Sequence, residues 1–396
     1  MPDELLQIKG VELPLRRPGS RASGLRGWDA ADELLLEQAL ECLGTRPEQR
    51  VLILDDQFGA LTLGLAEFSP VTLADSATLI SALQLNATEN LPCTEPESWL
   101  KPPVTAFDLV VMRIPRQADY LAWLLRWVNQ VLDPAGLIIA GGMIKHLPDR
   151  SAQVFDELVR TQTVCPARKK ARVVIAKRGQ QTLEGWSEQW RGFRVPDANV
   201  QVDALPAVFS RRKLDIGTRE LLPFVRQLVT GLPPGSRILD LACGNGVLGL
   251  AALSQRGDLD VTFSDVSSQA VLSAHHNVER AFPDAQAHFI HGDGVSQLLA
   301  AGILSSEIPD FDLILLNPPF HEGGVVGDHI ALALFEQSAS VLATGGRLLM
   351  VGNRHLGYHR TLKQSFSRVR QLASAPKFVV FEAGHQESGY QESGRL

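Results

Sequence analysis

The two halves of this 396-residue sequence repeat one another, and this repeat constrains the fold more than any other feature. Three pairs of segments correspond in the same order: 53–59 and 238–244, 107–111 and 311–315, and 131–136 and 341–346. Each half alternates short apolar, β-branched runs with longer helical patterns, which is typical of βαβ units on a parallel sheet buried on both faces. The sequence therefore predicts an α/β protein with two tandem, doubly wound domains, which we interpret as an internal duplication.

The second copy carries the clearer pattern. We expect strands at 237–241, 260–264, 285–291, 311–316 and 347–351. Helices are expected at 267–281, with Ser267 as N-cap, and at 330–341. A hairpin across 369–381 would then add an antiparallel closing strand to a mostly parallel sheet.

Composition shifts along the chain suggest where the domains begin and end. We expect a first domain at 1–178, an aromatic-rich linker at 179–205, a second domain at 206–383 and a disordered tail at 384–396. The linker holds two tryptophans and a phenylalanine, so we expect it to pack on one of the domains.

Cysteine usage and hydropathy exclude several classes of protein. The four cysteines lie far apart without a C-x-x-C spacing, which argues against a disulfide framework or a zinc knuckle. No histidine pattern favours a metal site. The first residues are acidic and no apolar run approaches the length of a membrane span. We therefore expect a soluble, cytoplasmic protein with no metal and no membrane partner.

The basic residues are unevenly distributed. The formal net charge is −6, yet segment 165–213 holds eleven basic and four acidic residues. Such a segment is either a solvated surface or a phosphate-binding one. The candidates for phosphate contact in it are Arg168, Lys169, Lys170, Arg172, Arg211 and Arg212.

A glycine loop follows the first expected strand of the second copy. Asp240-Leu241-Ala242-Cys243-Gly244-Asn245-Gly246 lets backbone approach a nucleotide-like ligand closely. Asp265, 19 residues after Gly246, ends the next strand, where a carboxylate can accept two ribose hydroxyls, and Asp293 ends the third near an adenine edge. Gly244, Gly246 and Gly249 also satisfy G-x-G-x-x-G, so a nicotinamide dehydrogenase fits this loop. Asp240 instead suits a cationic, amino-bearing ligand such as S-adenosylmethionine.

The fourth expected strand of this copy runs into Asn317-Pro318-Pro319-Phe320. Two prolines fix the turn, so the Asn317 side-chain oxygen and the Pro318 carbonyl should point to the ligand-binding end of the sheet. Two acceptors can draw an exocyclic amine of a nucleobase towards tetrahedral geometry and free its lone pair for in-line methyl transfer. Phe320 would stack on the base.

These motifs together resemble the RlmG and RsmC family of bacterial rRNA guanine-N2 methyltransferases. The resemblance rests on 208–211, 214–217, the loop 240–246, the corner 317–321 and 353–356, and it covers nearly the whole chain. The total length is closer to the 23S rRNA members than to the shorter 16S ones. The resemblance implies two Rossmann-like class I methyltransferase domains, of which the first is degenerate.

The same resemblance implies roles for individual residues. S-adenosylmethionine would contact Asp240, Ala242, Gly244, Asn245, Gly246, Asp265 and Asp293, with Gly217 and Arg219 closing over its methionine end. Guanine would be held by Asn317, Pro318, Pro319 and Phe320. Ala242 departs from the family loop, where a glycine often stands, and adds one methyl group near the cofactor.

The first copy lacks these groups. Its loop 55–59 is missing the second close-approach glycine, and Arg113-Ile114-Pro115-Arg116 replaces Asn-Pro-Pro-Phe, so Arg113 and Arg116 would face RNA phosphates instead. The alternatives are a 16S rRNA enzyme, a methyltransferase of adenine 6-amino groups or protein glutamine, and an RNA-binding chaperone with an inactive fold. The nicotinamide dehydrogenase also stays open.

Overall fold

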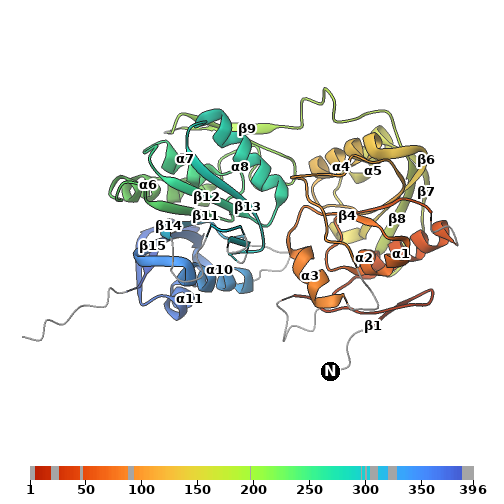
Figure 1. Cartoon of the computed structure of the whole chain (residues 1–396), viewed down its shortest axis with the longest axis horizontal. Helices are drawn as coiled ribbons and strands as arrows, with labels where there is room; N and C mark the ends of the chain where they lie inside the picture. The colour runs from red at the N-terminus through yellow and green to blue at the C-terminus, as the bar shows by residue number, and fades with distance from the viewer. Residues whose placement is uncertain are drawn as a thin grey trace, which may run out of the picture. The chain divides into compact units, whose positions relative to one another are not determined.

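The computed structural model describes residues 5–18, 26–44, 48–87, 93–196, 198–295, 297–298, 301–303, 311–319 and 328–385, the side chains of 328 and 329 excepted. The chain divides into two compact units, Met1–Trp190 and Arg191–Leu396. Each unit has its own sheet and its own helices (Figure 1). The predicted tail falls almost wholly on residues 386–396, which lie outside the described residues.

Unit 1 is built on a six-stranded sheet with the order β4-β3-β5-β6-β8-β7. Its strands are β1 (Leu5–Ile8), β2 (Val11–Pro14), β3 (Val51–Leu54), β4 (Val71–Leu73), β5 (Phe107–Arg113), β6 (Leu132–Met143), β7 (Arg160–Val164) and β8 (Ala171–Lys177). Its helices are α1 (Ala30–Leu43), α2 (Ala60–Gly64), η1 (Ala66–Phe68), α3 (Thr78–Asn86), α4 (Ala118–Val131), η2 (Ile144–His146) and α5 (Ser151–Leu158). β1 and β2 form a separate hairpin.

Unit 2 is built on a seven-stranded sheet with the order β13-β12-β11-β14-β15-β17-β16. Its strands are β9 (Arg191–Val195), β10 (Val200–Ala204), β11 (Arg237–Leu241), β12 (Asp260–Asp265), β13 (Gln286–His291), β14 (Phe311–Leu316), β15 (Leu342–Asn353), β16 (Arg368–Ser374) and β17 (Phe378–Gly384). Its helices are α6 (Ile216–Thr230), α7 (Val247–Leu253), α8 (Ser268–Ala281), α10 (Asp328–Val341), η3 (Arg354–Leu356) and α11 (Tyr358–Ser365).

The two sheets have the same topology. β4-β3-β5-β6-β8-β7 in unit 1 corresponds strand for strand to β12-β11-β14-β15-β17-β16 in unit 2, which adds β13 at one edge. β11 to β15 pair in parallel, whereas β17 pairs antiparallel with β15 and β16. The predicted fold class is confirmed: two tandem Rossmann-like domains, each with an antiparallel closing hairpin.

Strand register corrects the alignment of the two copies. Leu54 pairs with Met112 in unit 1, and Leu241 pairs with Leu316 in unit 2. Segment 107–111 corresponds to 311–315, so the strand partners of Leu54 and Leu241 are equivalent, and Leu54 corresponds to Leu241. The sequence repeat had matched Leu54 with a residue two positions earlier. Gly59 and Gly246 are then equivalent, and both are left-handed N-caps, of α2 and α7 respectively.

This register changes what the first copy lacks. Unit 1 retains the glycine that begins the helix, Gly59, and has Gln57 where unit 2 has Gly244. It also has Ile53 in place of Asp240. The alignment by sequence was wrong because two short apolar runs that contain an acidic residue can be matched at more than one offset. Backbone pairing between strands allows only one register.

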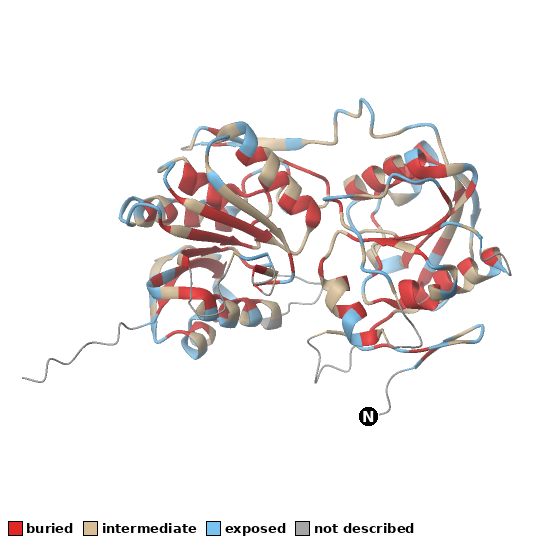
Figure 2. Ribbon diagram, viewed as in Figure 1, coloured by how far each residue is buried: buried red, intermediate tan, exposed pale blue. Residues whose placement is uncertain are grey.

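The unit 2 sheet is buried on both faces. Ile238, Leu313 and Leu315 belong to a core that also contains residues of α6, α7 and α8. Leu239, Ile314 and Leu316 belong to a second core, with residues of α10 and α11. Successive residues of one strand thus alternate between two cores, as a sheet covered by helices requires. Figure 2 shows the strands in the middle of each sheet as buried.

The expected linker is shared between the units rather than packed on one of them. In unit 1, the Gly179 amide donates to Asn129 Oδ1 at 2.8 Å, and the Arg126 guanidinium lies 4.9 Å from the centre of the Trp186 ring. In unit 2, β9 and β10 form a hairpin whose Phe193 packs against the core. Trp186 therefore contacts unit 1 and Phe193 contacts unit 2. None of the described helices is both long and apolar enough to cross a membrane.

Candidate active site

The glycine loop joins β11 to α7 through left-handed backbone. Ala242, Gly244 and Gly246 have φ angles of +55°, +55° and +79°. A Cβ at Gly246 would lie 3.0 Å from the Cβ of Ala274 in α8, so this glycine permits close packing of the two helices. No described atom lies within 4 Å of a Cβ built on Gly244. Gly244 is therefore the loop position that leaves open space.

Asp265 connects this loop to the end of β12. Its Oδ2 accepts a 2.8 Å hydrogen bond from the Gly244 amide, and its Oδ1 accepts one of 2.8 Å from the Ser267 amide. The Asn245 carbonyl accepts a 3.0 Å hydrogen bond from Asn277 Nδ2 of α8. Both the loop and the carboxylate are thus fixed by hydrogen bonds before any ligand binds.

The Asn317-Pro318-Pro319 corner follows β14 directly, as predicted. Asn317 Nδ2 donates to Asp215 Oδ2 at 3.1 Å and to Thr218 Oγ1 at 2.9 Å. Asn317 Oδ1 is buried and has no hydrogen-bond partner among the described residues. The amide nitrogen is therefore held within the protein, and the oxygen is left for a ligand.

A single cavity of about 450 Å³ joins these parts. Of the predicted residues, it is lined by Ala242, Gly244, Asn245, Asp265, Asn317, Pro318 and Pro319. The loop after β11 and the corner after β14 are adjacent because their strands pair in parallel, so both carboxyl ends meet at the same edge of the sheet. Phe320, the predicted stacking residue, lies outside the described residues.

Asp240, predicted at the cofactor, lies off the cavity lining. It lies within β11 on the same face as Ile238, is 1% exposed, and does not line the cavity. Its Oδ2 accepts a 2.8 Å hydrogen bond from the Gly249 amide of α7. Burial, reinforced by the charge of Asp265, raises the pKa of Asp240 well above its ordinary value. One oxygen of this carboxyl group thus binds the helix behind the loop, and the other, Oδ1, is buried without a hydrogen-bond partner among the described residues.

Four other residues predicted at the cofactor also lie off the cavity lining: Gly246, Asp293, Gly217 and Arg219. Gly217 is buried in the first turn of α6, where a Cβ would lie 3.1 Å from the Phe378 ring. Asp293 and Arg219 are exposed. The contact of these four residues with the cofactor stays a prediction.

The cavity is also lined by residues for which no ligand-binding role was predicted. They are Phe193, Ala207, Val208, Phe209, Ser210, Leu214, Asp215 and Thr218, together with Cys243, Val247, Leu248, Val266, Ser267 and Ala270. Segments 208–211 and 214–217 were part of the family resemblance. Their local sequence patterns, however, do not indicate which groups they contact. Phe209 is 67% exposed and offers an aromatic face. Burial raises the pKa of the Cys243 thiol well above its ordinary value, which does not favour a thiolate nucleophile.

Arg113 departs from its prediction as an RNA-binding residue. It is 8% exposed, and its guanidinium bonds Asp29 at 2.8 Å and also forms an ion pair with Asp32. Burial penalises the charge of Arg113, but these two carboxylates outweigh that cost and raise its pKa. Arg113 is committed to an internal ion pair, so it does not face phosphates. Arg211 is likewise buried, and its Nε donates to the Ala204 carbonyl at 3.0 Å.

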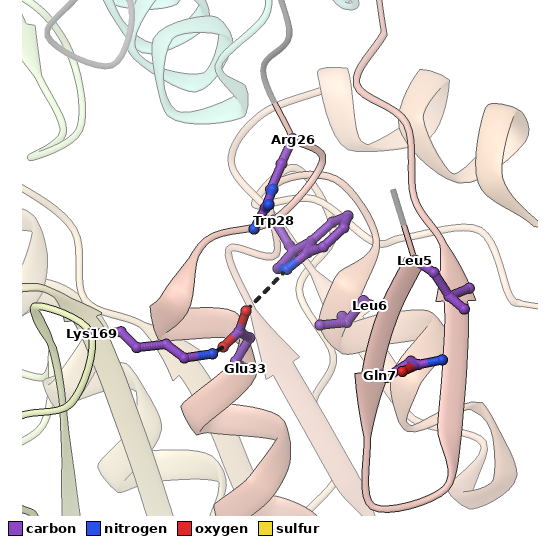
Figure 3. A pocket seen from close by; sticks show the side chains of 7 residues that line it. All are labelled: Leu5, Leu6, Gln7, Arg26, Trp28, Glu33 and Lys169. Carbon is purple, nitrogen blue, oxygen red and sulfur yellow. Dashed lines mark hydrogen bonds and ion pairs between the residues drawn. The ribbon is translucent and has the colours of Figure 1, made fainter. Parts of the chain in front are cut away.

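The remaining basic candidates are exposed: Arg116, Arg168, Lys169, Lys170, Arg172 and Arg212. Arg168 forms an ion pair with Glu37, and Lys169 forms one with Glu33, both on α1. Figure 3 shows Glu33 between Lys169 and Trp28, whose indole nitrogen donates to the same carboxylate at 3.3 Å. Lys170 and Arg172 have no ion pair among the described residues. Among the six exposed candidates, these two are well placed to meet an external anion.

Comparison with known proteins assigns the chain to a family. Residues 199–382 match the Methyltransferase small domain, and residues 3–180 match the RLMG N-terminal domain. A ribosomal RNA large subunit methyltransferase G from Alcanivorax borkumensis is 38% identical over 93% of this chain and 94% of its own length. The chain belongs to the ribosomal RNA large subunit methyltransferase G family. A Pseudomonas aeruginosa member of the family is 37% identical over 93% of this chain and 96% of its own.

A solved structure supports the fold of the whole chain. It is a T. thermophilus 16S rRNA N2 methyltransferase, RsmC, in complex with AdoMet and guanosine. The two share 24% identity with a TM-score of 0.74, over 97% of this chain and 98% of that one. The two-unit architecture of this methyltransferase G family member therefore extends to RsmC.

Proposed function

We propose that the protein transfers a methyl group from S-adenosylmethionine to the exocyclic 2-amino group of a guanine in 23S rRNA. The observation that carries this proposal is the one cavity lined by both the glycine loop and the Asn317-Pro318-Pro319 corner. A methyl donor and an amine acceptor must share one enclosure, because in-line transfer requires the reacting atoms about 3–3.5 Å apart. The names of the family members support the same substrate class. With this function we place the protein in the cytoplasm, and we assign it no membrane partner and no metal.

The residues at the loop end of the cavity fit S-adenosylmethionine. Asp265 lines the cavity, and its carboxylate is the kind of acceptor that ribose hydroxyls need. Gly244 leaves open space for close approach. Leu214, Val247 and Leu248 line the cavity with apolar side chains that suit a purine. When bound, this cofactor supplies an electrophilic methyl group on a sulfonium centre.

The chain's own residues would orient the amine. Asn317 Oδ1 is a buried acceptor without a partner among the described residues, and the Pro318 carbonyl belongs to the same fixed corner. Two acceptors bind the two N–H groups of a guanine amine and turn its lone pair away from the ring. The amine needs no strong base before attack, because its proton is lost to solvent after the transfer.

Unit 1 would serve RNA binding or structure and carry no chemistry. Arg113 occupies the position equivalent to Asn317 and has donors only, so it cannot accept a hydrogen bond from an amine. Lys170 and Arg172 supply exposed positive charge on the same unit for RNA phosphates.

Methyl transfer from labelled S-adenosylmethionine tests the proposal. The substrates are 23S rRNA and 16S rRNA that lack the modification, DNA, and bulk protein. We expect label in 23S rRNA alone, and digestion followed by mass spectrometry should identify 2-methylguanine. Label in adenine, in 16S rRNA or in protein would assign one of the alternative activities. An absence of both transfer and cofactor binding would favour the RNA-binding chaperone.

A further inference from the structure

We propose that Asp215 and Thr218 are positioning residues that fix the direction of the Asn317 amide and thereby select an amine as the group presented to the methyl donor. The proposal rests on the proposed function and adds two residues to it. Asp215 and Thr218 come from the start of α6, and Asn317 lies 102 residues after Asp215. All three line the same cavity.

The direction of the Asn317 amide follows from the chemistry of its partners. An ionised carboxylate can only accept hydrogen bonds, so the amide nitrogen must face Asp215 Oδ2, 3.1 Å away. The Thr218 hydroxyl donates to the same Oδ2 at 3.3 Å, which leaves its oxygen to accept from Asn317 at 2.9 Å. Asp215 thus determines the direction of every hydrogen bond in this group of three residues.

The same network fixes Asp215 itself. Asp215 is the N-cap of α6, and its Oδ2 accepts a 2.9 Å hydrogen bond from the Thr218 amide. A capping carboxylate near a helix N-terminus is stabilised by the backbone donors there. The acceptor that orients Asn317 is therefore rigid, and the opposite end of the amide, Oδ1, is the one left without a described partner.

Unit 1 contains the same arrangement with different chemistry. Asp29 is the N-cap of α1, Asp32 lies three residues later, and both bind Arg113 at the end of β5. These residues correspond to Asp215, Thr218 and Asn317 by topology and strand register. A contact between the helix cap and the strand end is thus built into both copies. In this contact, unit 2 alone has an acceptor without a described partner, Asn317 Oδ1. The reason is that its strand-end residue carries a side-chain amide and the third residue of its helix carries a hydroxyl group.

Three substitutions test this positioning role in the full-length protein. Asp215→Asn retains a capping oxygen but also offers an N–H group to Asn317, which favours a flipped amide with its N–H₂ towards the substrate amine. We expect kcat to fall about 100-fold. Thr218→Val removes one of the two acceptors and should lower kcat about tenfold. Thr218→Ser keeps the hydroxyl and should restore kcat to within about twofold of the unmodified protein.

The binding of S-adenosylhomocysteine separates positioning from direct cofactor contact. Positioning predicts that its Kd, measured by calorimetry, changes less than about threefold in all three variants, a small free-energy change. A kcat that stays within about twofold in both Asp215→Asn and Thr218→Val would overturn the proposal. A loss of kcat matched by an equal loss of cofactor affinity would also overturn it.

A spectroscopic measurement makes the proposal independent of the substrate. In nitrogen-15 asparagine-labelled protein, the Asn317 side-chain amide is assigned by its loss in Asn317→Ala. We expect its two proton shifts to move in Asp215→Asn and in Thr218→Val, and to stay in Thr218→Ser. Unmoved shifts in the first two variants would refute the network. If the shifts move while unmodified rRNA receives no methyl group, the assigned activity fails and the positioning stands.

Discussion

Asp265 Oδ2 accepts a 2.8 Å hydrogen bond from the Gly244 amide, so the carboxylate at the end of β12 and the open position of the glycine loop form one rigid wall of the cavity. The second oxygen of Asp265 is held by the Ser267 amide, next to the start of α8. The carboxylate is therefore preorganised for a pair of hydroxyl donors, and its removal should affect cofactor binding more than the reacting amine.

We expect Asp265→Ala to weaken S-adenosylhomocysteine binding by at least about tenfold, because a hydrogen bond to a charged group contributes roughly 1.5–3 kcal/mol. Calorimetry measures the affinity. Asp265→Asn is the matched control, since it retains an acceptor for the Gly244 amide and should lose less affinity. An unchanged Kd in the alanine variant would show that the cofactor lies elsewhere.

Asn317→Ala should abolish turnover and leave cofactor binding intact. The substitution removes the acceptor for the substrate amine and leaves Asp265 and Gly244, the groups assigned to the cofactor, unchanged. A loss of about 100-fold or more in kcat is the expected size. Single-turnover assays and calorimetry with S-adenosylhomocysteine separate the two effects. Full activity in this variant would contradict the assigned role.

Arg113→Ala should destabilise unit 1. The change leaves Asp32, which is 3% exposed, as a buried carboxylate without its cation, and breaking such a pair costs about 3–5 kcal/mol. Hydrogen exchange of the peptides that cover α1 and β5 measures the loss within the full chain. Arg116→Ala, an exposed neighbour, should change the same peptides by less than about 0.5 kcal/mol. Equal exchange in the two variants would mean that the ion pair contributes little.

Asp55 should make the stability of unit 1 depend on pH. Burial, and then the charge of Asp75, raise the pKa of Asp55 from 3.8 to about 7. A raised folded-state pKa means that the contribution of Asp55 is fully present below the unfolded pKa and is lost as pH rises through about 7.

Asp55→Asn mimics the protonated form at every pH and tolerates the left-handed backbone at this position, where φ is +55°. We therefore expect the stability of this variant relative to the unmodified protein to increase between about pH 4 and pH 8, by up to about 4 kcal/mol. Asp149→Asn, at an exposed carboxylate, is the matched control. Denaturant unfolding across the pH range checks the sign, and a flat or opposite trend would contradict it.

Lys170→Glu with Arg172→Glu should weaken rRNA binding and reduce its dependence on salt. Both residues are exposed without an ion pair among the described residues, and removing one cation from a phosphate should lower the salt slope by roughly 1. Filter binding at several salt concentrations measures the slope. Charge reversal at Lys363 and Arg368 of unit 2 is the matched control. An unchanged slope would remove these two residues from the RNA interface.

Local sequence patterns predicted the main strands and helices of unit 2 and their order. Alternating apolar runs fixed the strands 237–241 and 311–316 at the bounds that the structure has, and the capping serine placed the start of α8. These features are local, since burial on both faces of a strand, a cap and a proline pair each leave their pattern within a few residues. The glycine loop and the Asn-Pro-Pro corner were therefore visible before any coordinates.

Which side chains contact one another depends on the tertiary fold. Asp240 lies at the strand end as predicted, but the alternation of side chains along β11 turns it towards α7 instead of the cavity. Asp215 contacts Asn317 across 102 residues, and Arg113 is neutralised by a helix cap 84 residues earlier. Contacts of this kind depend on how helices pack on a sheet, and that packing depends on the whole core rather than on a short stretch of sequence.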